Sequence, residues 1–471
     1  PKTLLNRFQI SVEPIFLLVF FCFSLADAAS TNFLLIRTCT MVFGFSEANC
    51  THRISPSVQE IIQPYTAKII MGRALTQAIF PAILSLFIGS WTDGSKKRKP
   101  FIILPVIGLT IDYAMWLIFI YFPIPPIYFL LTILPYSLSG GSISLFTCAY
   151  CYLSDITNED NRAFRMSVLT VSLTIGMLSG YLVSTELYKT FQKDINFIIF
   201  GTSFCCMILT VLYTIFLLPE TIITEEIENS GERNNGKSFF NISHVKDSLA
   251  VLLKGRPSNG RLVLLLLIAI IVIDILVFQG ESNFRYLSLK ASFHWTVEDY
   301  NVFSAILSGV AVITSLVGIW LLNKVLGLSC TFTIALVLST CFLSSVLISL
   351  SKSPTGFYSA ALFGCLVVLL SPLIKSEMSY LVPNSDIGKV FAFTSTLEAV
   401  TPFAATPAYT EVYNAVISTK PLYLYFLSAG FWLLALILSL LIVSINCCYG
   451  HKYLPLEDEL GHENESNSIN T

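Results

Sequence analysis

Acidic side chains inside long apolar stretches are the groups of this sequence that could carry out chemistry away from water. Four of them fall near the midpoints of such stretches: Asp27, Asp112, Asp274 and Glu398. Burial in apolar surroundings disfavours the charged form of a carboxyl group, so such a group can bind and release a proton near neutral pH. All five histidines lie in expected loops or tails, which leaves these carboxyl groups as the candidate proton carriers at depth.

One predicted helix carries three ionisable residues on a single face. Asp274, Glu281 and Arg285 are spaced i, i+7 and i+11, a spacing that aligns side chains along a helix. We interpret Asp274 as a proton-coupling residue. Two interpretations stay open for the other two residues: proton coupling by Glu281, or a salt bridge between Glu281 and Arg285 that serves packing alone.

A single basic residue, Lys375, lies within its own apolar stretch. A fixed cation that faces a cavity attracts an anionic solute, which makes Lys375 a candidate for substrate binding. The alternative is a lysine that extends along the helix to the inner membrane surface. Arg73 and Gln77, one helical turn apart, and Glu398 are further candidate contacts for a substrate.

Charged residues at such depth require helices that cross a bilayer. Of the 471 residues, 54% are hydrophobic and 12% are charged, and the mean hydropathy is +0.72. A bilayer core about 30 Å thick needs roughly 20 apolar residues per helix. The sequence therefore predicts an all-α membrane protein with twelve transmembrane helices, in two six-helix halves. They are expected at residues 14–37, 68–91, 101–122, 127–153, 164–188, 195–218, 261–285, 298–322, 328–350, 356–378, 388–413 and 421–446.

A polar stretch separates the sixth predicted helix from the seventh. We expect an N-terminal six-helix half over residues 1–218 and a cytoplasmic central loop over residues 219–260. A C-terminal six-helix half over residues 261–446 and a cytoplasmic tail over residues 447–471 follow. Basic residues are more frequent on the side of the N-terminus, which predicts that both ends of the chain face the cytoplasm.

The first outer loop has two features of a segment exposed outside the cytoplasm. Asn49 begins the sequon Asn49-Cys50-Thr51 and is a candidate glycosylation site. Cys39 and Cys50 flank this loop, where an oxidising compartment permits a disulfide. A bonded pair and two free thiols both fit the sequence.

The polar tail and the overall charge bear on partners. Tyr453 begins a tyrosine-x-x-hydrophobic pattern that a sorting adaptor could read, although such short patterns also arise by chance. The net charge of −2 gives no reason to expect a nucleic-acid partner. No Cys-x-x-Cys pair has a matching second pair, so we expect neither a metal site nor a cofactor.

A short motif follows the second predicted helix. It runs over residues 89–100 and contains Gly89, then Asp93, then a basic cluster with Lys97 and Arg98. It resembles the loop between helices two and three of the major facilitator superfamily. In that loop the aspartate accepts hydrogen bonds from a neighbouring helix N-terminus, and the basic residues hold the inner gate. A plain basic anchor at the inner surface is the alternative.

Two further motifs extend the resemblance over nearly the whole chain. Asp155 lies in the segment 152–157 and is followed by Arg162 and Arg165, and the segment 371–382 leads from the tenth predicted helix into the eleventh. With the Glu13-Pro14 pair that opens the first helix, they resemble the proton-coupled folate transporter family, solute carrier family 46. The chain is identified as a divergent, insect-like member, and gating roles are implied for Asp155, Arg162 and Arg165.

That resemblance implies proton-linked uptake of organic anions or related conjugates. Separately, we expect the protein in the plasma membrane or the lysosomal membrane. Lys375 falls where the folate transporter has a substrate-linked arginine. Thr170 stands where that transporter has a glutamate on its fifth helix, and Lys96 replaces a glycine of the superfamily motif. No histidine lies in the seventh predicted helix. These departures argue against folate itself as the substrate.

The predicted function is therefore secondary active transport of a small organic, anionic solute, coupled to protons and working by alternating access. No ATP-binding loop accompanies the helices, so a gradient has to drive uphill movement. A membrane receptor or scaffold that binds a small ligand without transporting it is the alternative. An enzyme is not expected, because no Ser/His/Asp set or histidine-rich cluster lies at membrane depth.

Overall fold

A computed structural model describes residues 11–51, 55–95, 98–157, 159–191, 194–219, 259–382 and 384–449. Within these ranges all regular secondary structure is helical. The expected central loop, the tail with Tyr453, and Lys97 of the basic cluster lie outside the described residues.

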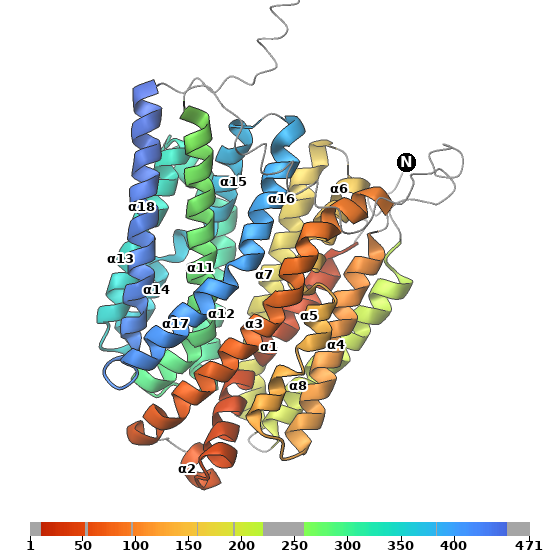
Figure 1. Ribbon diagram of the computed structural model, residues 1–471, viewed down its shortest axis with the longest axis vertical. Helices are drawn as coiled ribbons and strands as arrows, with labels where there is room; N and C mark the ends of the chain where they lie inside the picture. Colours follow the sequence, from red (N-terminus) through yellow and green to blue (C-terminus); the bar gives the residue numbers. More distant parts are fainter. Residues whose placement is uncertain are drawn as a thin grey trace, which may run out of the picture. The chain divides into compact units, whose positions relative to one another are not determined.

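Sixteen α-helices account for most of the described chain (Figure 1). Those of the first half are α1 (Glu13–Arg37), α2 (Glu47–Thr51), α3 (Pro56–Ser95), α4 (Lys99–Tyr121), α5 (Leu134–Leu138), α6 (Gly141–Ile156), α7 (Glu159–Thr190) and α8 (Ile195–Phe216). Those of the second half are α11 (Gly260–Phe293), α12 (Val297–Ile319), α13 (Cys330–Leu350), α14 (Pro354–Phe363), α15 (Leu370–Tyr380), α16 (Asn384–Val400), α17 (Pro402–Val416) and α18 (Leu424–Tyr449). Short π or 3₁₀ turns lie at η2 (Thr38–Val42), η3 (Pro126–Leu130), η5 (Trp320–Val325), η6 (Cys365–Leu369) and η7 (Pro421–Tyr423).

Local sequence sets several helix starts. Glu13 and Pro14 open α1, where the acidic side chain suits the positive end of the helix dipole and proline lacks only an amide that would be unpaired. Ser329 precedes α13 and its Oγ accepts a hydrogen bond from the amide of Phe332. Ser353 does the same for Gly356 at the start of α14. Such caps satisfy amides that have no partner inside the helix.

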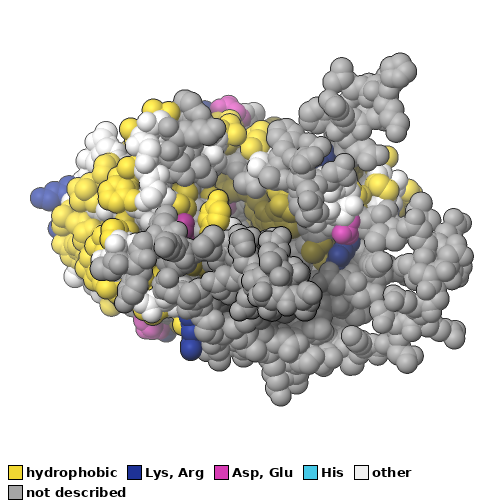
Figure 2. Space-filling view, turned by 90° about the horizontal axis from the view of Figure 1, so that it is seen from above, with side chains coloured by type: hydrophobic (Ala, Val, Ile, Leu, Met, Phe, Trp, Pro, Cys, Tyr) yellow, Lys and Arg dark blue, Asp and Glu magenta, His cyan; other side chains and the backbone are white. Residues whose placement is uncertain are grey.

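The composition of the helices makes the chain a multi-pass membrane protein. Among the described residues, eleven helical segments are long and apolar enough to cross a membrane. On the face of the molecule in Figure 2 most described side chains are hydrophobic, and acidic or basic side chains form only a few isolated spots. Many large apolar side chains are exposed along the helices, including Ile313 at 65% and Leu316 at 63%, which fits contact with lipid rather than with water.

The expected eleventh span is not one continuous helix. Residues 388–413 fall on α16 and α17, which are 17 and 15 residues long and are separated at Thr401. Pro402 lacks the amide that would bond to the carbonyl of Glu398 one turn earlier, so the helix cannot continue unbroken through it. The second expected span, residues 68–91, lies within α3, which begins earlier, at Pro56, and runs on through Pro64 and Pro81.

The chain divides into two compact units, and each is described by itself. Unit 1 comprises residues 1–240, 279–312 and 402–424, and unit 2 comprises residues 241–278, 313–401 and 425–471. The first six predicted spans therefore share unit 1 with segments of α11 and α12 and with α17. The division into two six-helix halves stays a prediction.

Close contact between α1 and α7 is a main feature of unit 1. A Cβ added to Gly176 would lie 2.3 Å from the carbonyl oxygen of Leu17, and one added to Gly180 would lie 2.4 Å from that of Phe21. Glycines four residues apart thus let the two backbones touch, as small residues do between membrane helices.

We expect Gly176→Ala to lower stability by about 1–3 kcal/mol, because backbone atoms on the facing helix cannot move aside as a side chain would. The measurement is thermal unfolding of the purified protein in detergent. Gly201→Ala on α8 is the matched control, since a Cβ there meets nothing within 4 Å. Equal unfolding temperatures for the two variants would contradict the close approach.

Unit 2 is held by an apolar core built from the helices α11, α13, α15, α16 and α18 and the turns η5 and η6. Its most buried members include Ile270 and Ile271 on α11, Val337 and Leu338 on α13, and Ile374 on α15. Trp432 and Ala435 of α18 belong to the same core. The charged residues of this unit therefore lie in strongly apolar surroundings.

Candidate functional site

Three ionisable residues of unit 2 lie close together. Nζ of Lys375 on α15 is 3.5 Å from Oε1 of Glu398 on α16. Asp274 on α11 is near enough to both to interact with them electrostatically. These residues belong to three separate predicted helices, and the fold brings them into one cluster of one cation and two carboxyl groups.

Interrupted helices position this cluster. Lys375 follows the 3₁₀ turn η6, which breaks the tenth span between α14 and α15. Glu398 lies three residues before the break at Thr401, whose hydroxyl bonds to the carbonyl of Leu397 at 2.8 Å. Discontinuous membrane helices expose backbone groups and commonly mark binding sites in secondary transporters.

The Lys375–Glu398 pair is loose and accessible. Their side chains keep 41% and 25% of their surface exposed, and no direct hydrogen bond accompanies the 3.5 Å contact. The neighbouring Ile374 and Leu373 are buried, so the pair sits at the edge of an apolar core. An accessible cation whose partner is held loosely can exchange that partner for another anion.

Asp27 forms a different cluster, in unit 1. Its Oδ2 accepts hydrogen bonds from the hydroxyls of Tyr181 on α7, at 3.0 Å, and Tyr300 on α12, at 3.1 Å. Both tyrosines are buried. Arg285 on α11 interacts electrostatically with the same carboxylate and lies 3.7 Å from Glu281. The i, i+4 salt bridge between Glu281 and Arg285 is therefore present, and proton coupling by Glu281 stays a prediction.

Other hydrogen bonds of unit 1 also join the first six spans to α12 and α17. The amide of Asn301 donates to Ser184 at 2.8 Å, and Ser184 donates to the carbonyl of Leu25 at 3.1 Å. The hydroxyl of Tyr413 donates to Gln63 on α3. Unit 1 thus contains side-chain hydrogen bonds between α7 and α12 and between α3 and α17.

Arg73 and Asp112 pair with each other. Arg73 lies 2.9 Å from Asp112, donates to the carbonyl of Phe129 at 3.0 Å, bonds to Thr132, and packs over the ring of Trp116. Asp112 is 2% exposed. The guanidinium of Arg73 is therefore bound by other residues of unit 1. Substrate binding by Arg73 and proton coupling by Asp112 stay predictions.

Gln77, the further predicted substrate contact, is partly buried one turn after Arg73 on α3. Its backbone carbonyl accepts a hydrogen bond from the hydroxyl of Ser137 at 3.2 Å. The structure therefore assigns the backbone of Gln77 to packing, and a role for its side chain stays a prediction.

Two ion pairs link the expected gate residues to their surroundings. Arg98 lies 3.1 Å from Asp155, which ties the start of α4 to the end of α6. Arg165 lies 3.0 Å from Glu13 and donates to Ser11. For three further expected gate residues the structure describes only the backbone, namely Gly89, Asp93 and Arg162.

The outer loop contains the expected cysteine pair as a disulfide between Cys39 and Cys50. It anchors the short helix α2 to the end of the first span. Asn49 on α2 is exposed. The sequon is thus presented on a constrained, accessible loop.

We expect the expressed protein to lose mobility on gels through a glycan on Asn49. Treatment with peptide N-glycosidase should remove the shift, and Asn49→Gln should abolish it, because the exposed asparagine is the acceptor. Asn241→Gln is the control and should change nothing, since that sequon lies in the expected cytoplasmic loop. A shift that persists in Asn49→Gln would mean that another asparagine carries the glycan and would refute the assignment of Asn49.

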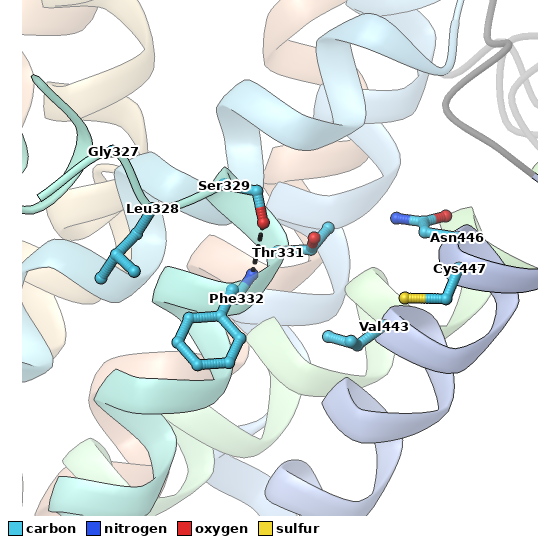
Figure 3. A pocket seen from close by; sticks show the side chains of 8 residues that line it. All are labelled: Gly327, Leu328, Ser329, Thr331, Phe332, Val443, Asn446 and Cys447. Carbon is cyan, nitrogen blue, oxygen red and sulfur yellow. Dashed lines mark hydrogen bonds between the residues drawn. The ribbon is translucent and has the colours of Figure 1, made fainter.

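A groove of about 590 Å³ lies at one end of unit 2 (Figure 3). Its lining is uncharged and comes from the segment before and at the start of α13 and from the end of α18: Gly327, Leu328, Ser329, Thr331, Phe332, Val443, Asn446 and Cys447. The hydroxyl of Ser329 is engaged in the helix cap drawn in Figure 3. This groove includes none of the ionisable residues considered above.

Two arrangements were not predicted from the sequence: Tyr181 and Tyr300 as partners of Asp27, and the ion pair of Glu13 with Arg165. A tyrosine inside an apolar span carries a weak signal, because its ring suits the membrane and its hydroxyl is ignored by hydropathy. A buried hydroxyl nevertheless needs a partner, and that requirement could have drawn attention to these positions.

Taken together, eleven described spans, interrupted helices and ionisable clusters at depth define an α-helical membrane transport protein. The Major Facilitator Superfamily model matches residues 16–406. The chain belongs to this superfamily.

The curated relatives are transporters of solute carrier family 46, which confirms the resemblance noted in the sequence. The probable peptidoglycan muropeptide transporter SLC46 of Drosophila melanogaster is 25% identical over 428 residues, covering 87% of this chain and 81% of that protein. The lysosomal proton-coupled steroid conjugate and bile acid symporter SLC46A3 of Gallus gallus is 23% identical, covering 91% and 93%. The proton-coupled folate transporter of Bos taurus is 21% identical, covering 93% of each chain.

Solved structures agree on the fold. The inward-open xylose transporter XylE from E. coli has a TM-score of 0.62 at 14% identity, covering 92% of this chain and 96% of that chain. The human organic anion transporter MFSD10 has a TM-score of 0.59 at 14% identity, covering 91% and 97%.

Proposed function

We propose that the protein is a proton-coupled carrier of a small organic anion. The observation that carries this proposal is the cluster of Lys375, Glu398 and Asp274 beside interrupted helices of unit 2. A solute carboxylate or sulfate binds Lys375 in place of Glu398. Protonation of the neighbouring Asp274 then removes a negative charge that an apolar environment tolerates poorly.

Charge balance couples the two ligands. The cluster holds one cation and two carboxyl groups, so an added anion increases its negative charge and an added proton reduces it. Each ligand therefore favours binding of the other, and the coupling is reciprocal. An inward proton gradient then drives accumulation of the anion.

The relatives support this chemistry without fixing the solute. Two of their names state proton coupling, and the named bile acids and folates carry acidic groups. Thr170, which replaces the glutamate of the folate transporter, is exposed and bonds to the carbonyl of Met166 at 3.2 Å. Its hydroxyl does not titrate in the relevant range, so proton binding in this chain falls to Asp274 and Asp27.

The test is uptake into proteoliposomes under an imposed pH gradient. A panel of folates, steroid conjugates, peptidoglycan fragments and cyclic dinucleotides supplies the candidate solutes. We expect one class to accumulate when the outside is acidic and to leak out when a protonophore collapses the gradient. Saturable binding without accumulation of any solute would instead assign a receptor or scaffold, and a chemically altered solute would assign an enzyme.

The compartment follows from the same chemistry. A carrier driven by protons works where one side of the membrane is acidic, and the chicken relative is named as lysosomal. We therefore include the lysosomal membrane with the plasma membrane as proposed locations. The sorting pattern at Tyr453 stays a prediction.

A further inference from the structure

Lys290, near the end of α11, is a cation with only neutral partners. Its Nζ donates to the amide oxygen of Asn32 on α1 and lies 3.3 Å from the hydroxyl of Tyr286. Within the described part of the chain it forms no ion pair. By contrast, a carboxylate accompanies each of four other basic residues in the spans: Arg73, Arg165, Arg285 and Lys375.

In these surroundings a neutral partner stabilises the charge of Lys290 poorly. Lys290 is only partly exposed, and Tyr286 is 3% exposed. Withdrawing an ammonium group from water is costly unless a strong acceptor replaces the water. Charge-assisted hydrogen bonds to an anion are about twice as strong as those to a neutral acceptor. An oxyanion would therefore satisfy Lys290 better than the amide of Asn32 does.

The same amide oxygen marks where such an anion would bind. Oδ1 of Asn32 accepts from Lys290 and also from the hydroxyl of Tyr286, at 3.0 Å. A third donor is close: Tyr188 on α7 interacts electrostatically with Tyr286 and has a buried hydroxyl without a hydrogen-bond partner among the described residues. One ligand oxygen in place of Oδ1 would meet two donors at once.

Three carboxylates lie in these surroundings: Glu298 interacts electrostatically with Lys189 and Tyr188, and the other two accept hydrogen bonds. Asp299 interacts electrostatically with Tyr286, but it accepts hydrogen bonds from the amide and hydroxyl of Thr296. Asp27 accepts from two tyrosines. The cation of Lys290 is thus left for a ligand from outside the chain.

We propose that Lys290, Tyr286 and Asn32 form a recruitment site for the oxyanion group of the solute, a carboxylate, sulfate or phosphate, at the disulfide-loop end of unit 1. The ligand oxygen displaces Oδ1 of Asn32 from the two donors. Because Asn32 is on α1 and both donors are on α11, this exchange also breaks the link between the two helices. Binding of the solute thereby favours opening of that end. The assignment of the ligand rests on the proposed function.

The test uses inorganic sulfate as the probe and the purified full-length protein in a neutral detergent. Sulfate replaces chloride at constant ionic strength, and the unfolding temperature reports binding. Lys375→Gln serves as the background, so that binding at the unit 2 cluster does not contribute. We expect saturable stabilisation in this background, weakened about tenfold or more by Lys290→Gln and retained by Lys290→Arg.

A second variant keeps the proposal testable if Lys290→Gln does not fold. Asn32→Asp places a carboxylate beside Lys290, so we expect it to raise the unfolding temperature without sulfate and to abolish the response to sulfate. Equal sulfate affinity in Lys290→Gln and its parent would overturn the site. An undiminished response in Asn32→Asp would do the same.

Two further arms identify the source of the anion and separate this proposal from the transport function. Displacement of sulfate by a steroid sulfate supports a solute, whereas displacement only by anionic phosphatidylglycerol assigns a lipid headgroup and overturns the recruitment role. Loss of uptake in Lys375→Gln with sulfate binding intact supports both proposals. If the protein binds sulfate at Lys290 but accumulates no member of the panel, the carrier assignment is wrong. Lys290 then belongs to an oxyanion-binding site without a transport function.

Discussion

Lys375→Ala is expected to reduce acid-driven uptake of the anionic solute by about ten- to a hundredfold. The reason is that one charged hydrogen-bonding partner contributes roughly 1.5–3 kcal/mol to binding. Lys375 is the cation of the unit 2 cluster, and its 41% exposed side chain is open to a solute. Initial uptake rates in proteoliposomes at a fixed pH gradient, normalised to reconstituted protein, measure the loss.

Matched variants make this result specific. Lys352→Ala removes a lysine from an exposed turn between α13 and α14 and should leave uptake unchanged. Lys375→Arg keeps the charge and should retain part of the activity. The double variant Lys375→Ala/Glu398→Ala removes both members of the pair and should restore any lost stability but not uptake. Uptake by Lys375→Ala at the rate of the unmodified protein would refute the assignment.

Asp274→Asn is expected to abolish accumulation against a gradient while leaving exchange of labelled for unlabelled solute intact. Asparagine resembles a permanently protonated aspartic acid, so it permits solute binding but cannot release a proton. Asp274 interacts with both Lys375 and Glu398, which places any proton it carries beside the proposed anion site. Concentrative uptake and counterflow, measured on the same proteoliposomes, separate the two effects.

Two further substitutions serve as controls for the Asp274→Asn experiment. Asp274→Glu retains a titratable group and should keep accumulation, with a changed dependence on external pH. Asp194→Asn alters an exposed residue at the start of α8 and should have no effect. Asp194 has a left-handed backbone conformation, which asparagine also tolerates. Accumulation by Asp274→Asn equal to that of the unmodified protein would mean that the proton binds elsewhere.

Local patterns in the sequence predicted the helical architecture well. Eleven of the expected spans are present, because a run of apolar residues long enough to cross a bilayer is a property of neighbouring residues alone. The eleventh expected span was wrong as a single helix: hydropathy continues smoothly across Thr401 and Pro402, but the hydrogen-bond ladder does not.

The candidate sites were only half predictable. Depth in an apolar stretch drew attention to Asp112, but nothing in the stretch indicated that Arg73, 39 residues away, would be its partner. Asp27 was likewise singled out by depth. Its partner Tyr300 lies 273 residues along the chain, beyond the reach of any periodicity.

By itself, then, the sequence determined that this protein crosses a membrane many times, approximately where its helices lie, and which ionisable groups they carry to depth. Only the tertiary structure decided which groups meet: Lys375 with Glu398 and Asp274, Arg73 with Asp112, and Lys290 with a neutral amide. Hydropathy and helical spacing depend on residues a few positions apart. The partner of a buried charge is set by how distant helices pack, and in hydrocarbon that partner decides whether the charge is structural or available to a ligand.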